Sequence, residues 1–334
     1  MRITKMAVSL SAIAVTAALA LTGCSASSTD SDSSASATDS TTWPLTVTDD
    51  AGHEVTLDKQ PERIANTALS VTGTLLAIDA PVVATAATSV SSITDDKGFF
   101  SQWASVADER GVEVLYPDLT FDLESVIAAD PDLIIVSTSG ADSVYEDHYD
   151  ELTAQGIPVY VANYGSNSWE DLALDFGKLT GHSADAQQAI DDFDAYAAEA
   201  ADKITVPEGS TSIVSFNGAG KESGIAKKTS AQADILTKLG FDVVEADADL
   251  DTSTQVRQDF AFVTYENLSK AITGQTVFTL SDDGAKVDQL KADATLANLD
   301  AVTAGQVYPL GATSFRIDPY SGRQVIDQVV SDLS

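Results

Sequence analysis

The sequence predicts an α/β fold of two Rossmann-like lobes, each with a mainly parallel sheet, joined by a long interdomain α-helix. Three observations predict this class. Short apolar runs alternate with helical segments twice along the chain, as in parallel sheets covered on both faces. One long amphipathic segment separates the two alternations. The 334 residues suit two lobes after an N-terminal leader, at about 150 residues per domain.

The first 23 residues have the features of a secretory signal peptide. Arg2 and Lys5 precede an apolar run, and small residues precede Cys24. The apolar run is short for a membrane-spanning helix, which needs about 20 residues. LTGC, residues 21–24, resembles the lipobox of bacterial lipoproteins, in which the cysteine is lipidated and becomes the mature N-terminus. An ordinary signal peptide with a chance cysteine is the alternative, and the absence of any other cysteine argues against it.

A flexible tether is predicted to follow over residues 24–42, because Ser, Thr, Asp and Ala offer little to bury. The first lobe is then expected over 43–180, the interdomain helix over 181–205, and the second lobe over 206–334, with a last helix that can pack back on the hinge. The net charge of −33 argues against nucleic acid or a broad anionic surface as a partner. An anionic ligand would need a local basic pocket.

The first lobe opens with a predicted β-hairpin, since alternating apolar residues flank the turn DDAGH at 49–53. Further strands are predicted at 82–87, 112–116, 132–140 and 158–164, with helices at 121–129, 145–156 and 168–181. The long helix, 183–204, has apolar residues on one side and acids opposite. At about 30 Å it can run along both lobes.

The second lobe repeats the alternation. Strands are predicted at 211–216, 241–247, 260–264, 276–282 and 306–311, with helices at 231–240 and 266–272, another before the last strand, and one after Tyr320. The segment between the first of these strands and the helix at 231–240 is expected to be a loop.

The order of elements and several strings resemble the ferric-enterobactin-binding protein family of helix-hinged substrate-binding lipoproteins. The strings span nearly the whole mature chain and lie at 70–88, 96–116, 131–143, 163–169, 230–241, 257–268 and 307–327. The resemblance implies an extracytoplasmic protein, lipid-anchored to the bacterial cell membrane, that captures an anionic, catecholate-type ferric siderophore between its lobes. It further implies a monomer that delivers the ligand to an ABC permease and has no enzyme activity.

The chelator itself holds the iron in such a ligand, so the resemblance implies no cofactor and no metal-ligating residue of the protein. The alternatives are another iron chelate or cobalamin as the ligand, a surface lipoprotein without a transport role, and a nucleotide-dependent enzyme. Docking on the permease is implied to use acidic residues of both lobes. The first-lobe helix SVTGTLL, residues 70–76, has none.

The resemblance implies a ligand site with Phe315 and Arg316 in TSFRID and with Arg257 in RQDF. Guanidinium groups suit a bulky, aromatic and anionic chelate, because they stay protonated and can lie flat on rings. Taken alone, Arg316 would be a surface or salt-bridging arginine, with Asp318 nearby.

Two departures bear on the ligand. Ser101 and Ala226 stand where the family has an arginine and a tryptophan. Lys227 and Lys228 can restore charge beside the second position, although adjacent lysines before a helix are usually solvated. Trp103 is expected to supply aromatic surface. The same role is open to Phe100, Tyr164 and Trp169, each of which also suits core packing. The ligand expected is therefore an anionic ferric siderophore, not necessarily enterobactin itself.

The nucleotide-dependent alternative depends on TSIVSFNGAGKESG, which imitates a dinucleotide fingerprint with Gly218 and Gly220 after a strand and Glu245 after the next one. The third glycine is out of register, because Ser223 occupies its place. A hydrolase is disfavoured, since no G-x-S-x-G string occurs. The histidines, His53, His148 and His182, form no H-x-x-x-H pair, which weakens a bare metal-binding role.

Overall fold

The first lobe is built on a parallel sheet preceded by a small hairpin. The computed structural model describes residues 41–253 and 257–334, so the predicted signal peptide, Cys24 and nearly all of the tether lie outside the described residues. Strands β1 (Leu45–Thr48) and β2 (Glu54–Leu57) form the predicted hairpin. The five-stranded sheet has the order β5-β4-β3-β6-β7 with every pair parallel. Its strands are β3 (Ile64–Asn66), β4 (Val82–Thr85), β5 (Glu113–Val114), β6 (Leu133–Ser137) and β7 (Val159–Ala162).

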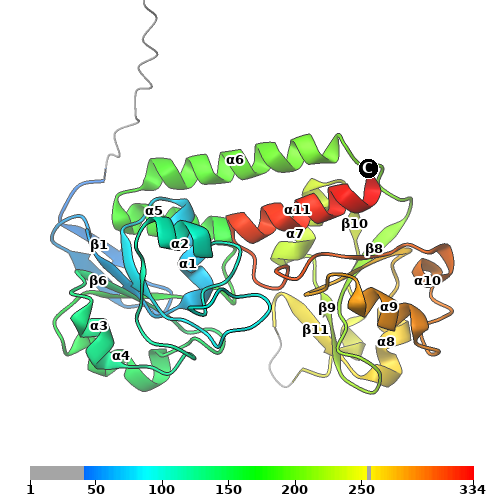
Figure 1. The fold of residues 1–334 in the computed structure, drawn as a ribbon, viewed down its shortest axis with the longest axis horizontal. Helices are drawn as coiled ribbons and strands as arrows, with labels where there is room; N and C mark the ends of the chain where they lie inside the picture. Colours follow the sequence, from blue (N-terminus) through cyan, green and yellow to red (C-terminus); the bar gives the residue numbers. More distant parts are fainter. Residues whose placement is uncertain (1–40, 254–256) are drawn as a thin grey trace, which may run out of the picture. The chain divides into compact units, whose positions relative to one another are not determined.

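Helices cover this sheet (Figure 1). They are η1 (Leu69–Val71), α1 (Thr72–Ala77), α2 (Ala104–Glu109), α3 (Leu123–Ala128), α4 (Tyr145–Thr153) and α5 (Trp169–Thr180). Every residue of β6 is buried, as expected for a strand covered on both faces. Local sequence sets the bounds of α5. Ser168 and Asp171 form a capping box at its start, and Gly181, with φ of 76°, ends it in the left-handed conformation.

The second lobe has a six-stranded mixed sheet. Its order is β11-β9-β8-β12-β13, and β10 pairs with the start of β8. Strands β10, β12 and β13 run parallel to their neighbours, whereas β9 and β11 are antiparallel. The strands are β8 (Ser210–Ser215), β9 (Ser223–Ala226), β10 (Asp242–Val243), β11 (Phe260–Val263), β12 (Thr276–Thr279) and β13 (Val307–Pro309). The helices are α7 (Ala231–Lys238), η2 (Ala248–Leu250), α8 (Tyr265–Ala271), α9 (Ala285–Ala292), α10 (Asp300–Ala304) and α11 (Pro319–Leu333).

Strand β9 corrects the predicted loop and removes the basis of the nucleotide-binding alternative. Gly218 and Gly220 lie between β8 and β9, which pair antiparallel. A dinucleotide fingerprint needs its glycines to lead directly into a helix, whose N-terminus receives the pyrophosphate. Here the glycines lead into a strand, so the resemblance to that motif was misleading.

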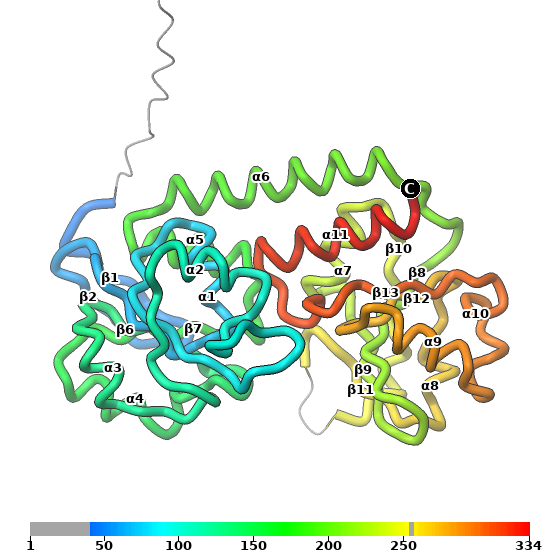
Figure 2. Tube along the Cα trace, in the orientation of Figure 1, coloured from blue at the N-terminus to red at the C-terminus, as the bar shows by residue number. Residues whose placement is uncertain are grey.

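Helix α6 (Ser183–Ala201) connects the lobes and runs beside α11 (Figures 1 and 2). Its buried face includes Phe193, and α11 approaches it closely at Gly322, where an added Cβ would lie 2.7 Å from the Phe193 ring. The start of α11 reaches the first lobe. Its N-cap Asp318 accepts a hydrogen bond from Gln102 Nε2 at 3.3 Å, and a side chain at Gly73 would overlap the Asp318 carboxylate.

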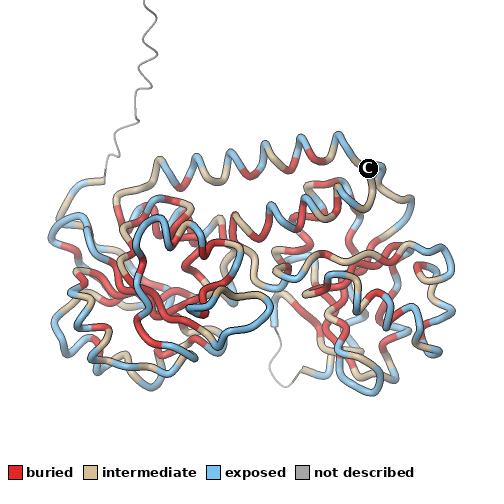
Figure 3. The backbone as a smooth tube through the Cα atoms, viewed as in Figure 1, coloured by how far each residue is buried: buried red, intermediate tan, exposed pale blue. Residues whose placement is uncertain are grey.

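Burial follows this arrangement, with buried residues concentrated on the sheets and on the inner faces of the helices (Figure 3). One apolar cluster continues from the first-lobe sheet through α6 and α11 into the second lobe, and another is confined to the second lobe. A continuous core across the junction favours small movements of the lobes. No helix in residues 41–253 or 257–334 is long and apolar enough to cross a membrane.

Candidate ligand-binding cleft

A cavity of about 1160 Å³ opens between the lobes, and both contribute to its walls. The first lobe contributes the loops that follow β6 and β7, the start of α1 and the start of α5. The second lobe contributes the start of α7, the segment before β11 and the turn before α11. Parallel strands place the loops at their carboxyl ends along one edge, which is where α/β proteins generally bind ligands.

The charged side chains of the cavity are unequally shared between the lobes. All four basic lining residues belong to the second lobe, namely Lys228, Lys238, Arg257 and Arg316. The acidic lining residues are Glu170 of the first lobe and Asp234 and Asp259 of the second. The lining is therefore slightly basic in a chain whose net charge is −33, and all of its positive charge lies on one side.

Arg316 lies where the sequence placed it, in the cleft. Its Nε donates to Ser70 Oγ at 3.2 Å, across the gap between the lobes. Its guanidinium lies 5.2 Å from the centre of the Phe100 ring and 5.8 Å from that of Phe315. Within the described residues no carboxylate is within ion-pair distance of Arg316. Asp318, the alternative partner, instead caps α11, where it accepts from the backbone N–H of Ser321 at 2.8 Å.

Local sequence fixes the turn that presents Arg316. Gly311 has φ of 92°, in the left-handed region that favours glycine. The Ser314 hydroxyl donates to the Gly311 carbonyl at 2.8 Å, and the Ser321 hydroxyl donates to the Arg316 carbonyl at 2.8 Å. These bonds hold Phe315 with 41 % of its surface exposed. Its ring is stacked with that of Phe260, the centres being 6.1 Å apart.

Arg257 also lines the cavity but is paired within its own lobe. Its Nε and a terminal nitrogen donate to the two oxygens of Asp259, at 2.8 and 2.5 Å. The hydrogen bond to this carboxylate raises the pKa of Arg257 above its usual value. The guanidinium also lies 6.0 Å from the ring centre of Phe260 and 5.9 Å from that of Phe262. The charge of Arg257 is thus matched by Asp259, and its guanidinium lies against two aromatic rings.

The two adjacent lysines differ. The Lys227 ammonium donates to the Arg257 carbonyl at 2.7 Å and to Asp251 at 3.4 Å, and Lys227 does not line the cavity. Lys228 does line it, and in the described part of the chain its ammonium has no hydrogen-bond or ion-pair partner. Its backbone N–H donates to Glu245 at 2.6 Å, which holds the residue in place. Lys228 therefore lies at the cavity, whereas Lys227 is held against the segment beside it.

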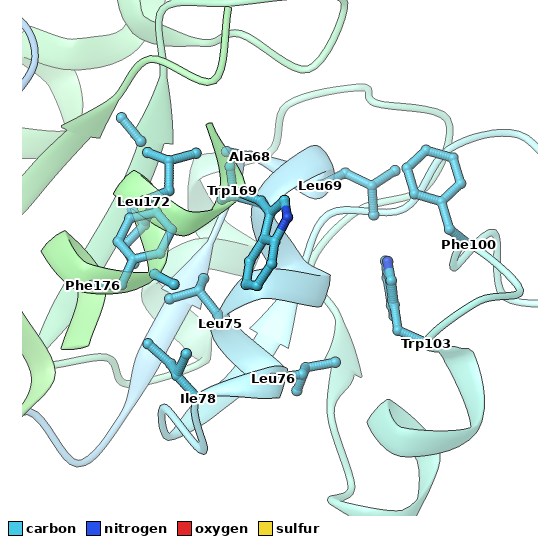
Figure 4. Close-up of a cluster of buried hydrophobic side chains, with 14 of the residues drawn as sticks. Ala68, Leu69, Leu75, Leu76, Ile78, Phe100, Trp103, Trp169, Leu172 and Phe176 are labelled. Carbon is cyan, nitrogen blue, oxygen red and sulfur yellow. The ribbon is translucent and has the colours of Figure 1, made fainter. Parts of the chain in front are cut away.

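Trp103 lies in the core instead of the cleft. It is 1 % exposed and packs on Phe99, with ring centres 5.3 Å apart. It also packs on Phe100, with ring centres 6.1 Å apart, and Figure 4 shows these two side chains near each other. The reason is tertiary, because Trp103 precedes α2 and packs beside Gly73 of α1. Phe100 reaches a smaller pocket of about 90 Å³, which Phe315 and Arg316 also line.

The positions that departed from the family pattern have different surroundings. Ser101 is exposed beside Phe100 and Gln102. Ala226 is fully buried in β9, where it pairs with Phe260. Directly opposite residues of an antiparallel pair lie on the same face of the sheet, so position 226 is on the side of Phe260, which lines the cavity.

Of the first-lobe wall, sequence reasoning named only Tyr164 and Trp169, as residues that also suit core packing, and both line the cavity. The rest of this wall consists mainly of hydroxyl and amide groups. The Ser139 hydroxyl donates to Asn163 Oδ1 at 2.6 Å, and the Gly165 N–H donates to the same oxygen at 3.1 Å. The Tyr164 hydroxyl donates to Asp142 at 2.5 Å. Burial, and to a smaller extent the charge of Asp142, raises the pKa of the Tyr164 phenol. The available signal was position, because these residues lie at or just after the carboxyl ends of the strands predicted at 132–140 and 158–164.

Lys238 was also missed. Its ammonium contacts Glu170 at 3.3 Å, Asp194 at 2.6 Å and Asp234 at 3.2 Å, so it ties α5, α6 and α7 together at the cleft. Burial by itself lowers the pKa of Lys238. The hydrogen bond to Asp194 and the charges of Asp234 and Glu170 outweigh burial, so the pKa lies above its usual value. These partners come from three separate helices, which no local motif reveals.

The described residues contain no group of three or more His, Cys, Asp or Glu side chains arranged to hold a metal ion. The arrangement instead suits a bulky organic ligand that bears negative charge and aromatic surface. Guanidinium and ammonium groups would form charge-assisted hydrogen bonds with the anionic groups of the ligand, and Phe315 would stack on its rings.

The chain is similar in sequence and in fold to known proteins. Residues 64–313 match the family model described as periplasmic binding protein. Over 290 residues the chain is 37 % identical to the ferric enterobactin-binding periplasmic protein FepB of Escherichia coli, covering 86 % of this chain and 90 % of that one. The crystal structure of holo-ViuP superposes with a TM-score of 0.81 at 36 % identity, covering 88 % of this chain and 96 % of that one.

More distant structures share the fold. The complex of Streptococcus pneumoniae PiaA with ferrichrome has a TM-score of 0.66 at 18 % identity, covering 86 % of this chain and 99 % of that chain. A FhuD-fold binding protein of Bacillus subtilis has a TM-score of 0.65 at 21 % identity, covering 86 % and 99 %. The predicted fold class, two α/β lobes joined by a long helix, is confirmed by these likenesses.

Proposed function

Since this chain belongs to the periplasmic binding protein family, we propose that it captures an anionic ferric siderophore between its lobes and delivers it to the permease of an ABC importer. Membership agrees with the resemblance found in the sequence. The relative FepB, 37 % identical, supports the ligand class, because it is a ferric enterobactin-binding protein.

One observation carries the proposal. In a chain of net charge −33, the cleft presents Arg316 and Lys228 without carboxylate partners in the described residues, beside the exposed ring of Phe315. A charge-assisted hydrogen bond to an anion contributes about 1.5–3 kcal/mol. Repulsion from the distant acidic surface is screened within about 10 Å at moderate salt. The local cations therefore outweigh the overall charge.

The volume of the cleft supports a large ligand. Small-molecule pockets usually enclose about 300–1,000 Å³, and this cavity measures about 1160 Å³. A ferric chelate carries its metal inside the organic ligand, so the protein has to supply only charge, rings and hydrogen bonds. We propose binding and delivery without catalysis, by a monomer.

Titration of the purified mature chain tests this function. Trp169 lines the cavity, so a bound chelate should quench its fluorescence. We expect binding of a ferric catecholate in the nanomolar-to-micromolar range, weaker binding of a ferric hydroxamate, and none of cobalamin. Calorimetry with the same complexes gives affinity independently of fluorescence. Failure of every ferric chelate to bind, or preference for cobalamin, would overturn the proposal.

We also propose that the protein is anchored to the membrane by lipid at Cys24, a residue outside the described ranges. Cys24→Ser should release the protein into the soluble fraction when cells are fractionated, because the lipid acceptor is lost. Retention of this variant with the membrane would contradict the anchor.

A further inference from the structure

The charge inventory of the cleft limits the charge of its ligand. Two cations, Lys228 and Arg316, have no carboxylate within ion-pair distance in residues 41–253 and 257–334. Arg257 is matched by both oxygens of Asp259. The remaining cation, Lys238, lies among three carboxylates at the hinge side.

Rearrangement of side chains does not change this inventory. If Arg257 turned toward a ligand, Asp259 would remain in the same cavity wall and would then face the ligand itself. Both partners of that pair are only partly exposed, with 45 % and 27 % of their side-chain surfaces accessible. An anion near Asp259 would meet repulsion that partial burial leaves incompletely screened.

The first-lobe wall supplies no further positive charge. Its lining consists of hydroxyls, amides, backbone and apolar groups, with Glu170 as its charged member, and Glu170 is paired with Lys238. The anionic part of a ligand is therefore matched from one side only. Asn163 illustrates the other side, since its Oδ1 already accepts from Ser139 and Gly165. Its Nδ2 donor has no partner within the described residues.

Resting on the proposed function, we infer that the cleft is selective for dianionic ferric chelates over trianionic tris-catecholates. The chelate end faces Arg316 and Lys228, and an uncharged, hydrogen-bonding part faces the Ser139–Asn163 side. An iron(III) complex with two catecholates and one hydroxamate-type arm is a dianion and belongs to this class. An iron(III) complex with three catecholates is a trianion, and its negative charge exceeds the two uncompensated positive charges of the wall.

A series of three ferric complexes tests the inference: a tris-catecholate, a mixed bis-catecholate hydroxamate and a tris-hydroxamate. Affinities are measured by calorimetry at low salt on the mature chain. We expect the wild-type protein to bind the dianion about tenfold more tightly than the trianion, a difference of about 1.4 kcal/mol. Equal affinities, or tighter binding of the trianion, would overturn the inference.

Asp259→Asn sharpens the test because it frees Arg257 and adds one net positive charge to the wall. It should move the preference about tenfold toward the trianion. Lys228→Gln removes one charge and should move the preference in the opposite direction. Asp288→Asn on α9 makes the same formal change as Asp259→Asn outside the cavity lining and should leave the preference unchanged.

The outcomes separate this inference from the function on which it depends. If no ferric chelate binds, the proposed function fails. If chelates bind but neither Asp259→Asn nor Lys228→Gln moves the charge preference, the function stands and this inference is wrong. Should Asp259→Asn fold poorly, as judged by its melting temperature, the Lys228→Gln result decides alone.

Discussion

The two walls of the cleft differ in how they are made. The first-lobe wall consists of loops after parallel strands β6 and β7, tied to each other by hydrogen bonds such as Ser139 to Asn163. The second-lobe wall consists of the turn before α11 and the antiparallel edge of a mixed sheet, and it carries Arg316, Arg257 and Lys228. The difference teaches that the basic groups of the cleft belong to one lobe and most of its hydroxyl and amide groups to the other.

The largest expected effect comes from the second-lobe wall. Arg316→Ala should weaken binding of an anionic ferric chelate about tenfold to a hundredfold, the equivalent of one charge-assisted contact. Arg316→Lys keeps the charge but loses the planar group that lies over Phe100 and Phe315, so its loss should be intermediate. Calorimetry measures both, with melting temperature as the folding control. Identical affinity in Arg316→Ala and wild type would remove this residue from the site.

Ser70→Ala is the matched change on the opposite wall. Ser70 is the first-lobe acceptor of the Arg316 hydrogen bond. Its loss leaves the guanidinium charge in place, so we expect a change in affinity of about threefold or less. A loss as large as that of Arg316→Ala would show that the first-lobe contact, rather than the charge, governs binding.

A smaller effect is expected at the paired lysines. Lys228→Gln should reduce affinity about threefold at low salt and flatten the dependence of binding on salt, because an accessible cation is lost. Lys227→Gln should leave the salt dependence as it is, since the ammonium of Lys227 is occupied by Asp251 and the Arg257 carbonyl. Affinities across a range of salt concentrations distinguish the two. Equal flattening by both variants would contradict the division between them.

The first-lobe wall can be perturbed without any change in charge. Gly140 has φ of 74°, and a Cβ there would overlap the Tyr164 hydroxyl. Gly140→Ala should therefore displace Tyr164 and weaken binding a few fold, with strain of about 1–3 kcal/mol in the loop. The salt dependence should not change. An altered salt slope would mean that the two walls do not act separately.

The smallest effect on binding is expected from Asp318, which lies where the lobes meet. Burial raises the pKa of this carboxyl to about 6, from 3.8, against the hydrogen bonds that lower it. The folded protein therefore favours the protonated form. Protonation of Asp318 stabilises the folded state, and this contribution to the free energy of unfolding is fully present below the unfolded pKa near 3.8. It is lost as pH rises through about 6.

Asp318→Asn keeps a capping oxygen but does not titrate. The difference in free energy of unfolding between wild type and this variant should fall by on the order of 2 kcal/mol between pH 4 and pH 7. Melting curves over this pH range measure it, and a constant difference would show that Asp318 does not titrate there. Chelate affinity, measured at each pH on both proteins, should differ by less than about twofold.

Much of the fold followed from local patterns. The run LIIV of β6 is buried on both faces, and the Ser168 cap and Gly181 stop of α5 follow helix-capping chemistry. Strand β9 could not be predicted from local patterns, because its sequence SGIA has weak strand propensity. It becomes a strand by pairing with β8 and β11. Tertiary pairing, absent from the local pattern, decides such segments.

The site was predictable only in part, for the same reason. Arg316 and Phe315 lie within one turn, so a motif could reveal them. The contacts of Lys238 join residues 68 and 44 positions apart, and the burial of Trp103 depends on a helix that lies earlier in the chain. The role of Lys227 could not be separated from that of Lys228 until the surroundings of each side chain were known.

The contact between Gly73 of α1 and Asp318 at the start of α11 has a consequence for the order in which the chain folds. Asp318 lies against α1 and accepts from Gln102, so the first lobe is covered in part by the helix that comes last. The first half of the chain therefore cannot complete its surface until α11 has folded against it. Until then α1 lacks the contact with α11 that it has in the folded protein.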